Sequence, residues 1–176
     1  MKKYTRTLIT AITFAAMSQS AFAASKANEL MDVKAYKNDL QTAFNHYQAS
    51  DYNKALPALE QMAKRGDKKA QYVLGTMYLN AQGTEQDLKK SYAWLKVANE
   101  QKSQHWKKPL RLLEDKLPTD FLALATEESE EYIRMYGAKA QKLKCRNTKV
   151  LGSKKPTHLC KKQELKPGFY FVADAS

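Results

Sequence analysis

Apolar side chains recur every three or four residues through most of the chain, and short polar stretches separate these periodic segments. This spacing places apolar residues on one face of an α-helix, as in helices that pack against one another. The pattern predicts helices over residues 35–49, 53–65, 67–80, 87–101, 104–116 and 119–136. Asp51, Asp67 and Asp87 stand near three of the predicted starts, where an aspartate can cap or neutralise exposed amides.

Two parts of the chain repeat one pattern of residue types. Shifting the sequence by 36 residues aligns the segments that begin at Asp51 and Asp87, and a leucine follows each aspartate by eight residues. Upstream the shift is 31, and the five extra residues of the second copy fall in the polar loop 80–86. Each copy therefore predicts a helical hairpin. A repeat of this length predicts a helical solenoid, which the last two helices would cap.

Gly75 interrupts the apolar face of the third predicted helix, within the stretch AQYVLGTMY. A glycine inside a helix costs about 1 kcal/mol relative to alanine, so a close contact with another helix would explain it. We expect Gly75, with Ala55, Ser91 and Ala98, to provide the small contacts that let paired helices approach closely.

The pattern over residues 67–102 resembles the Sel1-like repeat, a relative of the tetratricopeptide repeat. The residues that carry the resemblance are Ala70, Gln71, Tyr72, Leu74, Gly75, Tyr78, Gly83, Asp87, Lys90, Trp94 and Ala98. Residues 35–66 depart from the pattern, because Phe44 replaces the glycine and the loop is short, as in tetratricopeptide repeats.

The resemblance implies a scaffold that binds other proteins in a concave groove lined by the first helix of each repeat. The matching groove positions would be Asn38, Gln41, Asn45, Lys69, Tyr72, Thr76 and Asn80. The alternative is that these are simply solvated residues of a helix face.

The first 23 residues have the features of a secretory signal peptide. A basic start precedes a short apolar run from about Leu8 to Met17, and Ala21-Phe-Ala23 provides a cleavage site. The alternative, a membrane anchor, is disfavoured because the run is shorter than the roughly 20 residues that span a bilayer. We therefore expect an exported protein, most simply periplasmic, with no transmembrane segment in the mature chain. Its units would be a helical repeat domain over 24–137 and an appendage over 138–176.

The chain has two cysteines, Cys145 and Cys160, and an even number in an oxidising compartment favours a disulfide. The alternative, a metal site, lacks a histidine at ligand spacing from both cysteines. Gly152-Ser153 lies midway between them and predicts a hairpin turn. Pro156 would then occupy a hydrogen-bonding position, so we expect a bulge or a longer loop. The predicted fold is mainly α: a short helical solenoid with a small disulfide-clipped C-terminal β-hairpin, and residues 168–172 could add a strand.

Of the net charge of +12, nine units lie in residues 139–166, which contain ten Lys or Arg and one acidic residue. Such a block can mark a contact with an anionic polymer or lipid. The candidate residues are Lys149, Lys154, Lys155, Lys161 and Lys162. Alternatively, the block neutralises the glutamates at 127, 128, 130 and 131, or it is only solvated. Nucleic acid is the least expected partner for an exported protein.

The sequence contains no nucleophile elbow, phosphate-binding glycine loop or HExxH motif, and its three histidines lie in separate segments. We therefore expect a protein that is not an enzyme and has neither a cofactor nor a metal ion. The predicted function is binding of another envelope protein through the repeat groove. The alternative is binding of anionic envelope material through the basic segment.

Overall fold

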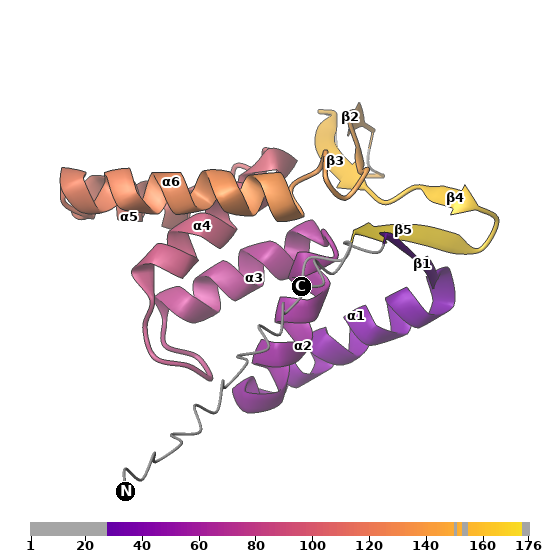
Figure 1. The fold of residues 1–176 in the computed structure, drawn as a ribbon, viewed down its shortest axis with the longest axis horizontal. Coiled ribbons are helices and arrows are strands. Elements are labelled where there is room, and N and C mark those ends of the chain that lie inside the picture. The colour runs from indigo at the N-terminus through magenta and orange to yellow at the C-terminus, as the bar shows by residue number, and fades with distance from the viewer. Residues whose placement is uncertain (1–27, 150, 153–154, 174–176) are drawn as a thin grey trace, which may run out of the picture.

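The computed structural model describes residues 28–149, 151–152 and 155–173 (Figure 1). The helices of this part of the chain are α1 (Val33–Gln48), α2 (Tyr52–Lys64), α3 (Lys68–Leu79), α4 (Leu88–Ala98), the short 3-10 helix η1 (Asn99–Gln101), α5 (Lys107–Lys116) and α6 (Thr119–Tyr136). The strands are β1 (Asn28–Asp32), β2 (Lys144–Thr148), β3 (Thr157–Lys161), β4 (Glu164–Lys166) and β5 (Phe169–Ala173). The prediction of a mainly α-helical fold with a small disulfide-clipped hairpin is confirmed. The predicted signal peptide lies outside the described residues.

The predicted helices agree with the observed ones to within a few residues. The fifth begins at Lys107 rather than at residue 104, which leaves Pro109 in its first turn, where proline is tolerated. The carboxylates of Asp67 and Asp87 cap α3 and α4 by accepting hydrogen bonds from Ala70 N (2.8 Å) and Lys90 N (2.9 Å). At α2 the Asp51 side chain makes no such cap; it forms an ion pair with Lys54 instead.

The two helical hairpins, α1–α2 and α3–α4, stack through the contact of α2 with α3. A Cβ atom added to Gly75 would lie 2.8 Å from Leu95 Cγ and 3.2 Å from Leu95 N, so α4 leaves no space for a side chain there. Ser91 Oγ donates a hydrogen bond to Gly75 O (2.8 Å), which joins the two helices at the same point. The close helix contact that Gly75 predicted is confirmed.

The last two helices cover the second repeat. Leu110 and Leu113 of α5 and Ala125 of α6 share a buried cluster with Leu95 of α4. On the other side of α4, Trp94 stacks on Tyr136 of α6, with ring centroids 5.0 Å apart. The α5–α6 pair therefore caps the solenoid. None of the helices in the described residues is long and apolar enough to cross a membrane.

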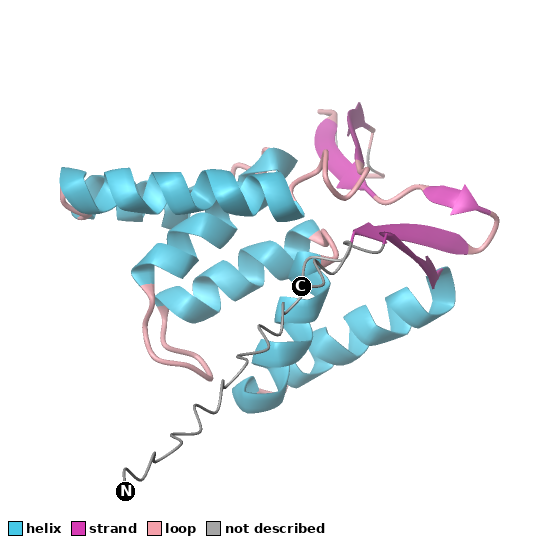
Figure 2. Ribbon diagram, viewed as in Figure 1, coloured by secondary structure: helices cyan, strands magenta, loops and turns pink. Residues whose placement is uncertain are grey.

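The strands gather beside the ends of the helices and form two small sheets (Figure 2). In the first, β2 and β3 are antiparallel, Cys145 lies opposite Cys160, and a disulfide joins the two. The pairing ends at Thr148 and Thr157, so Pro156 lies outside it, as its missing N–H requires. Cys160 N donates to Gln101 Oε1 (2.8 Å), which attaches this hairpin to η1.

The second sheet has the strand order β1-β5-β4 and was only partly predicted. Strand β5 matches the predicted segment at 168–172, whereas β1 was not expected. Leu30 of β1 lies opposite Phe171 of β5, so the sheet joins the segment before α1 to the C-terminal appendage. The division of the chain at residue 137 into two domains stays a prediction.

Candidate functional site

The first helices of the two repeats line a hollow of about 410 Å³, here called the groove. Its residues on α1 are Lys37, Leu40, Gln41 and Phe44, and at the start of α3 they are Asp67 and Lys69. Lys69 Nζ lies 4.2 Å from the centre of the Phe44 ring, in the geometry of a cation–π contact. The groove therefore combines an apolar floor with cations at its edges.

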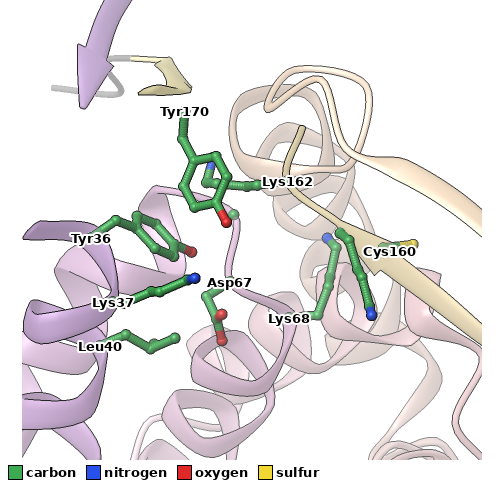
Figure 3. Close-up of a pocket in the computed structure, with 10 residues that line it drawn as sticks. Tyr36, Lys37, Leu40, Asp67, Lys68, Cys160, Lys162 and Tyr170 are labelled. Atoms are coloured by element: carbon green, nitrogen blue, oxygen red, sulfur yellow. The ribbon is translucent and has the colours of Figure 1, made fainter. Parts of the chain in front are cut away.

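A second hollow of about 270 Å³, here called the end pocket, adjoins the groove. Figure 3 shows residues that line it. The two hollows share Lys37, Leu40 and Asp67. The other residues of the end pocket are Tyr36, Gly66, Lys68, Cys160, Lys161, Lys162 and Tyr170. Its walls thus come from α1, the turn into α3, the segment from β3 to β4, and β5. The appendage and the repeats build this pocket together.

Two tyrosines form an aromatic wall of the end pocket. The rings of Tyr36 and Tyr170 meet edge to face, with centroids 5.3 Å apart. Burial raises the pKa of Tyr36 well above its usual value, and the neighbouring Asp67 carboxylate raises it further. Tyr36 is therefore a neutral hydrogen-bonding group at physiological pH.

Asp67 provides a carboxylate at the base of the end pocket. It is already engaged as the cap of α3 through the amide of Ala70. Burial raises its pKa, while hydrogen bonds from the first amides of α3 and the charges of Lys69 and Lys162 act in the opposite direction. Asp67 is consequently a structural acceptor in a cationic environment.

Lys162 is held in the end pocket by hydrogen bonds to other residues of the appendage. Its Nζ donates to Phe171 O (2.8 Å) and to Gln141 Oε1 (3.4 Å), and it lies 5.6 Å from the centre of the Tyr36 ring. Burial lowers its pKa to about 8, with smaller contributions from the charges of Arg65 and Lys68, although the attraction of Asp67 opposes the shift.

Between about pH 8 and pH 10.5, we expect the contribution of Lys162 to the free energy of unfolding to rise. Its folded pKa lies below the ordinary value of 10.5, so in this window the unfolded chain binds more protons than the folded chain and stability increases with pH. The effect should reach about 1 kcal/mol per pH unit. Urea denaturation of the wild type and of Lys162→Met over this range isolates it, because the tyrosines titrate in both proteins. If the difference in the free energy of unfolding between the two proteins did not change with pH, the lowered pKa of Lys162 would be contradicted.

Lys68 lines the end pocket with its side chain, but its ammonium group is bound elsewhere. Nζ donates to Glu100 Oε2 (2.6 Å), to Gln71 Oε1 (2.9 Å) and to Val97 O (3.2 Å). Glu100 Oε2 also accepts from Ala138 N (2.8 Å). Burial lowers the pKa of Lys68, and the attraction of Glu100 counteracts this. Lys68 therefore joins α3 to the end of α4 and is not free for a ligand.

Gln141 fixes the appendage to the repeats and is 1% exposed. Its Nε2 donates to Lys64 O at the end of α2 (2.9 Å) and to Ala173 O (3.4 Å), and its Oε1 accepts from Ala173 N (3.3 Å). Its side chain also packs on Gly66, where an added Cβ would lie 2.7 Å from Gln141 Cγ. These contacts hold the walls of the end pocket in a defined position.

Of the predicted binding residues in the first helices, Gln41 and Lys69 line the groove. Asn38 is exposed on α1, and Asn45 accepts a hydrogen bond from Gln41 Nε2 (2.8 Å). The structure thus gathers part of the predicted set around one hollow, and binding by these residues stays a prediction.

The other predicted groove residues lie further along α3 and do not line this hollow. Tyr72 is stacked on Trp106, with centroids 5.0 Å apart and an angle of 10° between the rings. Thr76 Oγ1 donates to Val73 O within the helix, and Asn80 is the C-terminal cap residue of α3.

The predicted basic residues are divided between two places. Lys161 and Lys162 line the end pocket, whereas Lys149 and Lys155 are exposed between β2 and β3. Lys154 lies outside the described residues. The ion pairs that the structure gives to the glutamate cluster come from other residues: Glu128 pairs with Lys89 (3.1 Å) and Glu131 with Arg134 (3.7 Å).

Sequence reasoning missed Tyr36, Lys37 and Tyr170 as site residues. Asp67 was expected only as a helix cap, and nothing local in the sequence indicated that these residues would meet. Within the described ranges, no group of three or more His, Cys, Asp or Glu residues could hold a metal ion.

Comparison with known proteins supports the fold alone. No protein-family model matches the sequence, and no curated protein matches it. A solved structure does: the crystal structure of c5321, a protective antigen present in uropathogenic Escherichia coli strains, which displays an SLR fold. The TM-score is 0.55 at 24% sequence identity, and the match covers 68% of this chain but 27% of that one, so this chain spans only part of its neighbour's length. The helical part of the chain therefore has a Sel1-like, tetratricopeptide-like fold.

Proposed function

We propose that this protein is a non-catalytic interaction module of the bacterial cell envelope that binds a segment of another protein in the groove. The observation that carries the proposal is continuity: the groove and the end pocket share three residues and adjoin each other along α1 and the start of α3. Helical repeats use such extended surfaces for binding.

The chemistry of the hollow favours binding rather than catalysis. Asp67 caps α3, and Lys162 donates to backbone and amide oxygens, so both groups are engaged in structural hydrogen bonds. Export is supported by the disulfide, which persists in oxidising compartments, and by the predicted signal peptide.

A tryptophan at Gln41 is expected to block the groove. Peptides that bind the mature protein, residues 24–176, would be selected from random linear peptides displayed on phage. The affinity of the enriched peptides would then be measured by fluorescence anisotropy. Gln41 is exposed and lines the groove, so Gln41→Trp should fill the hollow without disturbing the core. It should weaken peptide binding at least about tenfold, which corresponds to about 1.4 kcal/mol.

The matched control is Gln61→Trp, because Gln61 is also exposed but lies on α2 and lines neither hollow. It should bind the peptides as tightly as the wild type. Equal binding by both variants, or a selection that yields no specific peptide, would overturn the proposal. Binding that depends instead on the basic hairpin would favour the anionic-material alternative.

A further inference from the structure

We infer that the end pocket binds the side-chain carboxylate of an acidic segment in a partner protein. This inference rests on the proposed function and specifies which chemistry the groove selects. It is carried by the hydrogen-bond donors around the pocket and by the excess of cationic over anionic side chains among the described residues that line it.

Cations outnumber anions among the residues that line the hollow. Lys37, Lys69, Lys161 and Lys162 face it from three segments, and Asp67 is the one carboxylate among the lining residues. None of the ion pairs between described residues involves these four lysines. The hollow therefore carries an excess of positive charge, which Asp67 offsets only in part.

The donors converge on one place. The hydroxyl group of Tyr170 and the ammonium group of Lys37 point toward the same space above Asp67, where the Tyr36 hydroxyl is hydrogen-bonded to the Asp67 carboxylate (Figure 3). The Tyr170 hydroxyl can donate a hydrogen bond, and the lysine can make a charge-assisted bond. A carboxylate accepts several such bonds at once, whereas an ammonium or guanidinium group would meet like charges.

Lys162, which is partly buried, also favours an anionic ligand. Lys162 holds its charge in a dehydrated position, where burial disfavours it. Asp67 already stabilises part of that charge, and an anion bound nearby would stabilise it further.

The occupant we commit to is an acidic peptide segment rather than a lipid or a polymer. The pocket continues into the groove with its apolar floor of Leu40 and Phe44, which suits a chain that carries apolar and acidic residues together. A purely anionic polymer would not use that floor.

The test is a fluorescence anisotropy titration of the mature protein, residues 24–176, with a labelled peptide of alternating glutamate and leucine. Acetylated and amidated ends exclude binding through a terminal carboxylate. The glutamine counterpart of the peptide is the ligand control. We expect the glutamate peptide to bind and the glutamine peptide to bind at least tenfold more weakly.

Two charge-matched variants locate the interaction. Lys37→Gln removes an exposed lysine from the end pocket and should weaken binding of the glutamate peptide about tenfold. Lys149→Gln removes one charge from the exposed residue that follows β2, outside the pocket, and should change binding less than twofold. Both side chains are exposed, so neither substitution should impair folding.

The following results would overturn the inference. Equal losses in the two variants would indicate diffuse attraction to the basic segment, and equal binding of both peptides would exclude carboxylate recognition. Tighter binding to phosphatidylglycerol vesicles that Lys37→Gln does not weaken would indicate a lipid surface. A dimer in sedimentation would indicate that a second copy is the occupant. Groove peptides without acidic residues would overturn this inference but leave the proposed function standing, whereas failure to select any groove peptide would remove both.

Discussion

Replacing Gly75 with alanine is expected to lower the free energy of unfolding by about 2 kcal/mol, although alanine is the better helix former. The added Cβ would lie 2.8 Å from Leu95 Cγ and 3.2 Å from the Leu95 backbone nitrogen. Since a backbone atom cannot move without shifting α4, the steric cost should exceed the gain of about 1 kcal/mol in helix propensity. Urea denaturation followed by circular dichroism measures the difference.

A double-mutant cycle separates this contact from a general effect on the helix. Leu95→Ala removes the atom nearest to the added methyl group, so Gly75→Ala should cost less in that background than in the wild type. If Gly75→Ala increased stability, or if its cost were the same in both backgrounds, the explanation of Gly75 by helix contact would be wrong.

Replacing Lys68 with methionine is expected to cost about 3 kcal/mol, because it removes one partner of a largely buried ion pair. Methionine keeps most of the side-chain volume, so the loss reports on the ammonium group. Glu100, Gln71 and Val97 O would each lose a donor, and Glu100 would keep only the amide of Ala138. Chemical denaturation at neutral pH measures the loss.

Lys64→Met is the matched control, since it makes the same chemical change in a more exposed pair. Lys64 and Glu60 lie one helical turn apart, with their charged atoms 3.1 Å from each other and side chains 41% and 37% exposed. Such pairs contribute about 0.5 kcal/mol or less, so the control should be close to wild type. Equal effects in the two variants would mean that Lys68 has no special structural role.

The sequence predicted those parts of the fold that depend on neighbouring residues. Helix periodicity located the six α-helices, and one glycine on an apolar face indicated the contact with α4. Cys145 and Cys160 are equally far in sequence from Gly152-Ser153, and this spacing predicted that they would lie opposite each other in the hairpin. Each of these signals lies within a few residues or within one repeat.

The parts that were missed depend on segments far apart in the chain. Strand β1 is five residues long and is defined by its pairing with β5, which no local pattern indicates. The end pocket was missed for the same reason, because Tyr36 and Tyr170 meet only through that sheet. Lys68 and Gln141 carry side chains that are normally exposed, so their burial follows from the partners that the fold provides.

The pairing of β1 with β5 has a consequence for the order of folding. The helical hairpins close through contacts of short sequence separation, which form quickly, whereas β1 and β5 must find each other across almost the full described chain. The wall that carries Tyr170 should consequently be completed last, after the repeats have formed. A partner that depends on this wall would then bind only fully folded molecules, so binding itself would report that the last strand is in place.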